Sequence, residues 1–155
     1  MTPRLNLVEA APDAYRAMAG LERYLAGSSI EKPLRELVKL RASQINGCAY
    51  CIDMHWKDAR AAGETEQRLY GLDAWDESPY YSDRERAALI WTEALTLIHK
   101  DHVPDAVYER VKPHFSEKEL ADLTWLVAGI NTWNRVAIAL RAPAGTYKPG
   151  MHKHD

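Results

Sequence analysis

The chain places both of its cysteines, Cys48 and Cys51, in one short stretch that also contains His55. The cysteines are spaced as C-x-x-C, and the histidine follows the second cysteine by four residues. At about 100° per residue, a helix brings these three side chains onto one face, within about 60° of one another. Two thiols and an imidazole can therefore meet in one pocket, while the charged side chains of the same helix face the solvent.

The spacing of the two thiols favours a reversible disulfide. Residues three apart on a helix have Cβ atoms about 5–6 Å apart, whereas a disulfide requires about 3.5–4.5 Å. We expect the bond between Cys48 and Cys51 to close with a small distortion of the first helical turn. A bond of this kind is easily reduced, as in catalytic and regulatory pairs.

A thiolate, a second thiol and an acid–base group are sufficient to reduce a peroxide. The thiolate attacks the O–O bond and becomes a sulfenic acid, which condenses with the second thiol to a disulfide. The positive end of the helix dipole lowers the pKa of a nearby thiol, which favours Cys48 as the attacking group. Proton exchange with His55 favours Cys51 instead. The residue types alone leave this choice open.

Length and composition limit the class of protein. With 155 residues, the chain is expected to form a single domain over 1–155, with its core at about 12–140. Its 20 Lys and Arg residues and 22 Asp and Glu residues form no block of like charge, so we expect no nucleic-acid partner. The chain has neither the apolar run of a signal peptide nor the roughly 20 apolar residues of a membrane span. We therefore expect a cytoplasmic protein without a membrane partner, where a C-x-x-C is redox-active or metal-binding.

Apolar residues recur at helical spacing throughout the chain, which predicts an all-α fold. Two capping boxes, Ser82 with Glu85 and Ser116 with Glu119, mark helix starts. We expect an extended arm at 1–11 and a loose or partner-bound tail at 143–155. Between them, helices are predicted at about 12–27, 33–46, 48–62, 64–70, 82–99, 104–111 and 120–140.

The stretch from Leu37 to His55 resembles the core of the alkylhydroperoxidase D-like (AhpD-like) branch of the carboxymuconolactone decarboxylase superfamily. That family's motif is a glutamate, eleven residues, and then C-x-x-C-x-x-x-H. Counting back from Cys48 gives Glu36, so all four motif positions match. The resemblance implies a compact all-α fold, a homo-oligomer (a trimer or hexamer) and thiol-dependent reduction of organic hydroperoxides. It implies no cofactor; the electrons would come from an external reductant, either a thiol protein or a small dithiol.

The same resemblance assigns roles to the motif residues. It implies that Cys51 attacks the peroxide, that Cys48 resolves the intermediate, and that His55 and Glu36 form the proton relay. From its helix phase alone, Glu36 would instead be read as a solvent-facing residue. The chain also departs from the characterised alkylhydroperoxidase, which has a histidine between its cysteines where this chain has Tyr50. A phenol with a pKa near 10 is a poor proton shuttle at neutral pH, which predicts a weaker peroxidase.

Two other functions fit the cysteine pair. Cys48 and Cys51 could form a structural zinc site with His99 and His102, which supply two nitrogens to complete a tetrahedral set. The protein could also be a scaffold oligomer that keeps the pair as a slow thiol redox sensor. Bound zinc would identify the first alternative, and oxidation without rapid turnover would identify the second.

Overall fold

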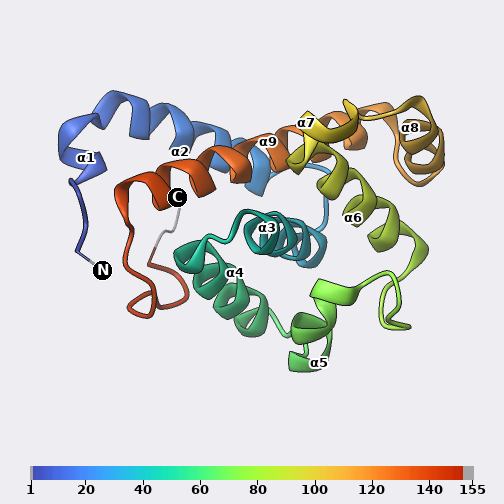
Figure 1. Cartoon of the computed structure of the whole chain (residues 1–155), viewed down its shortest axis with the longest axis horizontal. Coiled ribbons are helices and arrows are strands. Elements are labelled where there is room, and N and C mark those ends of the chain that lie inside the picture. Colours follow the sequence, from blue (N-terminus) through green and yellow to red (C-terminus); the bar gives the residue numbers. More distant parts are fainter. Residues whose placement is uncertain (1, 152–155) are drawn as a thin grey trace.

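The computed structural model describes residues 2–151, and all regular secondary structure in this range is helical (Figure 1). This confirms the predicted all-α fold. Both predicted capping boxes are present at the starts of α6 and α9. In chain order, the elements are α1 (Leu7–Ala10), α2 (Pro12–Ala26), α3 (Lys32–Asn46), α4 (Ala49–Ala61), α5 (Glu66–Tyr70), η1 (Gly71–Ala74), α6 (Asp83–Thr96), α7 (Ile98–Asp101), α8 (Asp105–Val111), η2 (Lys112–His114) and α9 (Glu117–Leu140).

Helix α3 is the central element of the described fold. It packs against α4, α6 and α9, which surround it in Figure 1. Its apolar side chains are divided between two clusters. Leu34 and Val38 pack with residues of α2, α6, α8 and α9, whereas Leu37 and Leu40 pack with residues of α4, α5, η1 and α6. Because α3 is covered on several sides, even its polar side chains come close to other helices.

A tight turn joins α3 to α4. Gly47 ends α3 in the left-handed conformation, with φ of 69°, which a glycine adopts without steric cost. The amide of Gly47 donates to the carbonyl of Gln44 (3.1 Å), and that of Cys48 donates to the carbonyl of Ser43 (3.0 Å). The chain reverses here, so α4 runs back along α3 and begins with the cysteine pair.

The structure corrects two predictions of local structure. Residues 1–11 are not wholly extended, because α1 forms within them and Asn6 caps it by accepting from the amide of Val8 (3.1 Å). The helix predicted over 82–99 ends at Thr96, and α7 follows after Leu97, whose ψ of 29° departs from helical geometry. No glycine or proline marks this break in the sequence.

The described part of the C-terminal tail is docked rather than loose. Tyr147 is only 6% exposed, and its carbonyl accepts from Nζ of Lys57 (3.1 Å). The amide of Gly145 donates to Oδ2 of Asp53 (3.1 Å), so these hydrogen bonds fix the tail to α4. Residues 152–155 of the predicted tail lie outside the described residues.

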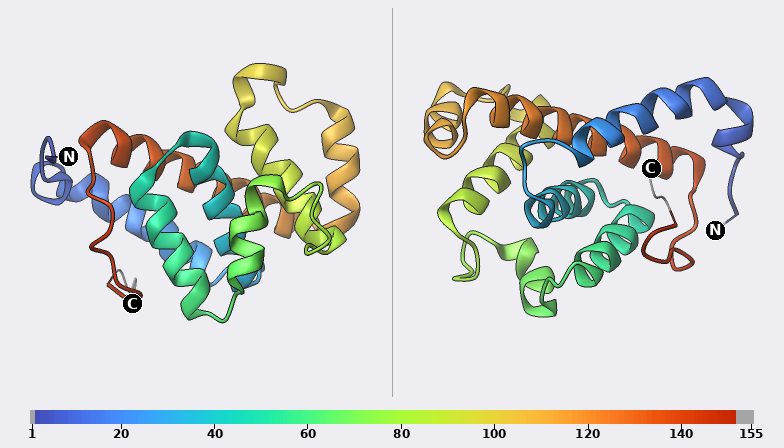
Figure 2. Two further views of the ribbon diagram at one scale, coloured as in Figure 1. Left: turned by 60° about the horizontal axis from the view of Figure 1, so that its bottom comes forward. Right: turned by 180° about the vertical axis from the view of Figure 1, so that it is seen from behind.

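The N-terminal segment and the tail lie at the same end of the molecule, near the end of α9 (Figure 2). The amide of Arg4 donates to the carbonyl of Leu140 (3.0 Å), which fixes the N-terminal segment there. Both ends of the described chain can thus contribute walls to a site beside α4. In residues 2–151, no helix has the length and apolar character needed to cross a membrane.

Candidate functional site

The cysteine pair occupies the first turn of α4. Cys48 is the N-cap, and its Sγ accepts from the backbone amide of Cys51 (3.3 Å). The two side chains form a disulfide across a Cα–Cα distance of 5.3 Å. Cys48 is 1% exposed and Cys51 is 2% exposed, so bulk solvent does not reach either sulfur directly.

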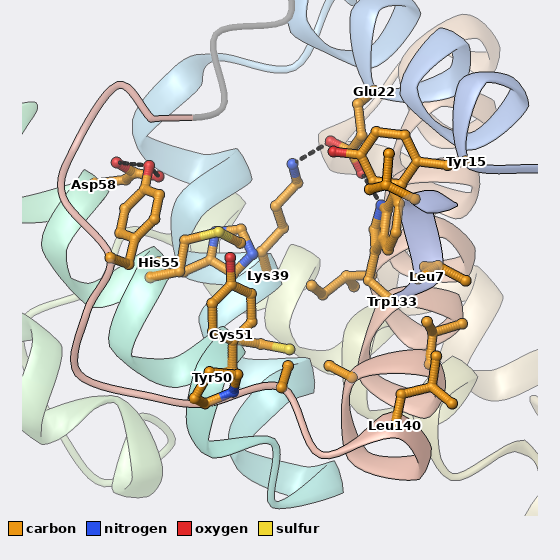
Figure 3. A pocket seen from close by; sticks show the side chains of 18 of the residues that line it. Leu7, Tyr15, Glu22, Lys39, Tyr50, Cys51, His55, Asp58, Trp133 and Leu140 are labelled. Atoms are coloured by element: carbon orange, nitrogen blue, oxygen red, sulfur yellow. Dashed lines mark hydrogen bonds and ion pairs between the residues drawn. The ribbon is translucent and has the colours of Figure 1, made fainter. Parts of the chain in front are cut away.

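A cavity of about 550 Å³ adjoins the pair on one side (Figure 3). This volume is within the range of about 300–1,000 Å³ that is typical of small-molecule sites. Cys51 lines the cavity, whereas Cys48 is not among the residues that line it. The walls come from α1, α2, α3, α4, α9 and the tail, and they include Leu7, Tyr15, Glu22, Lys39, Tyr50, His55, Asp58, Trp133 and Leu140.

His55 and Glu36 meet across the α3–α4 interface. Nδ1 of His55 lies 2.9 Å from Oε2 of Glu36, and both side chains are largely buried. Burial raises the pKa of Glu36, but the hydrogen bond with His55 and the charges of His55, Lys39 and Arg35 outweigh it, so the net pKa is lowered. Glu36 is therefore a carboxylate at neutral pH and accepts the Nδ1–H of His55. The prediction that Glu36 faces the solvent, made from helix phase alone, is wrong.

This hydrogen bond fixes the tautomer of His55. When Nδ1 of a neutral imidazole carries the proton, Nε2 presents a lone pair. Nε2 of His55 is buried and has no hydrogen-bond partner in the part of the chain that the structure describes. His55 also lines the cavity, so this proton acceptor belongs to a residue of the cavity wall.

A second carboxyl group, that of Asp58, flanks His55. One oxygen of Asp58, one oxygen of Glu36 and one nitrogen of His55 lie within 4.8 Å of one another. Burial raises the pKa of Asp58, the charge of Glu36 adds to this, and the hydrogen bond from Tyr147 opposes it. The hydroxyl of Tyr147 lies 2.8 and 2.9 Å from the two carboxylate oxygens (Figure 3). The tail thus forms part of the cavity wall.

The sequence analysis missed both Asp58 and Tyr147. Asp58 follows His55 by three residues, so its position on the same helix face could have been noticed. Tyr147 is 89 residues away from its partner, and no local pattern indicates this contact.

Elsewhere in the cavity wall, Glu22 of α2 forms hydrogen bonds with side chains of α3 and α9. Its Oε2 accepts from Nζ of Lys39 (2.6 Å), and its Oε1 accepts from the indole Nε1–H of Trp133 (3.1 Å). Tyr15 packs edge-on against Trp133, with a ring-centroid distance of 5.8 Å. Trp133 also lines the cavity.

Tyr50, between the two cysteines, also lines the cavity. Its side chain is half-buried, and burial raises the pKa of its phenol above the ordinary value near 10. The phenol therefore stays protonated at neutral pH. It contributes shape and a hydroxyl group to the cavity, but not an acid–base group that titrates near pH 7.

The structure does not support the zinc hypothesis. Cys48 and Cys51 are buried in a disulfide, whereas His99 and His102 are exposed near α7. Within residues 2–151, one group of three His, Cys, Asp or Glu side chains lies close enough together to hold a metal ion. It consists of Glu36, His55 and Asp58. Neither cysteine belongs to that group.

Comparisons with known proteins identify the family of the chain. Residues 12–94 match the model of the carboxymuconolactone decarboxylase family. The chain is 49% identical over 140 residues to the uncharacterized protein YdfG of Bacillus subtilis (strain 168), and the match covers 90% of this chain and 95% of that protein.

Two crystal structures share the fold. ATU0492 from Agrobacterium tumefaciens, described as a protein of unknown function and a putative antioxidant defence protein AhpD, is 41% identical with a TM-score of 0.90. The match covers 94% of this chain and 100% of that one. An uncharacterized peroxidase-related protein from Silicibacter sp. TM1040 has a TM-score of 0.80 at 24% identity, over 97% of this chain and 80% of that one. The chain is therefore an AhpD-like member of the carboxymuconolactone decarboxylase family.

Proposed function

We propose that the protein is a thiol peroxidase that reduces organic hydroperoxides through Cys51 and Cys48. One observation carries this proposal: Cys51 and His55 line the same cavity, and Nε2 of His55 has no partner among the described residues. Cys48 lies behind Cys51, bonded to it and away from the cavity lining. This arrangement favours Cys51 as the attacking thiol, as the family resemblance implies.

In the reduced protein, His55 is the base that activates Cys51. The two residues are four apart on α4, so their side chains are neighbours on the helix surface. Nε2 accepts the thiol proton, and the Glu36 carboxylate at Nδ1 stabilises the imidazolium that forms. The products of this transfer are a thiolate at the cavity wall and a proton held one helical turn away.

The thiolate then attacks the terminal oxygen of the hydroperoxide. An S–O bond forms and the O–O bond breaks, which oxidises Cys51 to a sulfenic acid. The departing alkoxide takes the proton from Nε2 of His55 and leaves as an alcohol. The hydroperoxide has gained two electrons, and they come from the sulfur.

Cys48 completes the half-reaction. Its thiolate attacks the sulfur of the sulfenic acid, an S–S bond forms, and the hydroxyl group leaves as water with the proton from Cys48. The sum is one hydroperoxide and two thiols giving one alcohol, one water and one disulfide. An external thiol protein or small dithiol then reduces the disulfide by thiol–disulfide exchange, so no bound cofactor enters the proposed cycle.

The proposal includes a cytoplasmic homo-oligomer, a trimer or hexamer. The 58% exposure of Trp125 on α9 supports a subunit contact, because a large exposed aromatic side chain is typical of interfaces. Sedimentation velocity measures the assembly directly. A monomer at micromolar concentration would contradict this part of the proposal.

Consumption of cumene hydroperoxide with dithiothreitol as reductant tests the function. We expect multiple turnovers by the wild type, none by Cys51→Ser, and a single oxidation event followed by slow turnover for Cys48→Ser. Ala49→Ser is the matched control, because Ala49 is exposed in the same helical turn and does not line the cavity.

The rate separates this function from the slow redox sensor. Tyr50 supports the sensor, because a phenol replaces the histidine of the characterised enzyme. If both thiols are oxidised by cumene hydroperoxide but the wild type turns over no faster than Cys48→Ser, the sensor replaces the peroxidase.

A further inference from the structure

Two cations of α3, Lys32 and Arg35, line the cavity. They are three residues apart, so they share one face of the helix. The Arg35 guanidinium donates to the carbonyl of Ile30, which precedes α3. Within residues 2–151, no carboxylate oxygen lies within 4.0 Å of the charged nitrogens of either side chain. Lys39, on the same wall, is instead paired with Glu22.

Three carboxylates that line the cavity are engaged elsewhere. Glu22 accepts from Lys39 and Trp133, Glu36 accepts from His55, and Asp58 accepts from Tyr147. Among the described residues, the half-buried positive charge of Arg35 is thus left without a close counter-charge.

A charge without a close counter-charge raises the free energy of the folded protein. Burial lowers the pKa of Arg35, and the more distant charges of Glu36, Glu31 and Glu22 do not restore it. A partly desolvated cation without a close anion destabilises the empty protein. A bound anion in the cavity would remove this cost, and an arginine with a lysine is well suited to a carboxylate.

The antiparallel pairing of α3 and α4 sets the distance from these cations to the reacting sulfur. His55 pairs with Glu36, so Cys51 and Lys32 lie on opposite sides of that contact along the interface. Four residues of helix rise about 6 Å, so along the helix axes the backbone of Lys32 lies about 12 Å from that of Cys51 and the backbone of Arg35 about 8 Å. The guanidinium of Arg35 extends further from Cys51, to the carbonyl of Ile30. Met54, Ile130 and Trp133 supply apolar surface in the same cavity.

We propose that this cavity takes an amphiphilic hydroperoxide with a carboxylate about 8–12 Å from the hydroperoxide group, bound by Arg35 and Lys32. The proposal rests on the peroxidase function. An apolar chain lies along the apolar wall, and the carboxylate holds the O–O bond against Cys51. A neutral hydroperoxide of the same length lacks this anchor and reacts more slowly at low concentration.

Binding of an unreactive probe tests the carboxylate site without any chemistry. Octanoate and 1-octanol have about the same length and differ in charge, and titration calorimetry on the disulfide form compares them. We expect octanoate to bind the wild type at least tenfold more tightly than octanol does. Arg35→Gln should remove this preference, and Arg35→Lys should keep part of it. Lys100→Gln, an exposed control on α7, should leave it unchanged. Equal binding of the two probes to the wild type would overturn the proposal.

Kinetics with a matched substrate pair test the same site during turnover. The pair is 8-hydroperoxyoctanoic acid and its methyl ester, compared by their kcat/KM values. We expect the acid to be favoured about tenfold by the wild type and not at all by the double variant Lys32→Gln/Arg35→Gln. Circular dichroism melting verifies that each variant is folded. If acid and ester react equally in the wild type, the carboxylate site is wrong and the peroxidase stands. If no hydroperoxide is consumed, the peroxidase is wrong and the octanoate titration alone decides the site.

Discussion

Two buried polar clusters of this protein differ in how completely their polar atoms are hydrogen-bonded. Asp122 on α9 is 1% exposed and accepts hydrogen bonds from the Tyr24 hydroxyl (2.6 Å), the Ser29 hydroxyl (2.8 Å) and Nζ of Lys118 (2.7 Å). Burial raises the pKa of Asp122, but the hydrogen bonds from Lys118, Tyr24 and Ser29 outweigh it and hold that pKa well below its usual range. This cluster fixes α9 to α2 and to the segment that follows α2.

In the cluster around His55, the polar atoms are only partly hydrogen-bonded. Nε2 of His55 lacks a partner in the described structure, and the pKa of Asp58 is shifted upward, against the direction seen for Asp122. A cavity adjoins this cluster, whereas Asp122 does not line that cavity. The difference supports the proposal that Asp122 serves stability and that His55 keeps an atom free for a reacting group.

Substitution of His55 should give the largest effect. His55→Asn removes the base at the cavity wall, so kcat/KM for cumene hydroperoxide should fall about 10²–10⁴-fold. Stopped-flow peroxide consumption measures this change. His99→Asn, at an exposed histidine, is the control and should stay at the wild-type rate. A His55→Asn protein within threefold of the wild type would end the assignment of His55 as the base.

Substitution of Asp122 should reverse this pattern, with a large loss of stability and little loss of rate. Asp122→Ala removes the acceptor of three side chains and should lower the free energy of unfolding by about 2–4 kcal/mol. Urea denaturation measures it, with Asp76→Ala, at an exposed acid, as control. If Asp122→Ala remained fully stable, or lost peroxidase activity while folded, the two clusters would not have separate roles in stability and activity.

The pH dependence of stability should distinguish the two carboxyl groups beside His55. In the folded protein, the pKa of Glu36 is below its ordinary value of 4.5. The charged carboxylate therefore stabilises the fold above pH 4.5, and this stabilisation is lost as the pH falls through the folded pKa. Glu36→Gln should therefore cost about 1–3 kcal/mol at pH 7 and less in acid.

Asp58 should show the opposite sign. Its folded pKa is above 3.8, so its charged form destabilises the fold at neutral pH, and protonation on acidification relieves this. We expect Asp58→Asn to be at least as stable as the wild type at pH 7. Urea denaturation at pH 4 and pH 7 measures both variants. Parallel pH profiles for the two variants would contradict the opposed shifts.

The smallest effect is expected at the tail. Tyr147→Phe removes the hydroxyl that donates to Asp58, which should cost about 0.5–1.5 kcal/mol of unfolding free energy. Thermal melting measures it against Tyr70→Phe, at an exposed tyrosine of α5, the green helix labelled in Figure 1. Equal melting temperatures of the two variants would show that this hydrogen bond does not hold the tail.

The sequence was sufficient wherever the determining interactions are local. Ser82 and Ser116 cap their helices as their spacing predicts, and Gly47 ends α3 as its conformational freedom predicts. The contact of Glu36 with His55 required the family motif, because helix phase alone directs Glu36 toward solvent. The reason is that α3 is covered on several sides, which phase on a single helix does not reveal.

The rest of the site depends on contacts between distant segments. Tyr147 reaches Asp58 across 89 residues, and Glu22 reaches Trp133 across 111 residues. Neither pair has a sequence pattern that identifies its partner. The zinc hypothesis failed for the related reason that two histidines of suitable type lie in an exposed segment remote from the cysteines.

Trapping of a sulfenic acid tests the central claim most directly. Reduced Cys48→Ser and Cys51→Ser are each mixed with one equivalent of cumene hydroperoxide and dimedone, and the adducts are located by mass spectrometry. We predict a stoichiometric adduct on Cys51 in Cys48→Ser and none on Cys48 in Cys51→Ser. An adduct on Cys48, or no adduct on Cys51, would contradict the account in which Cys51 meets the peroxide at the cavity wall.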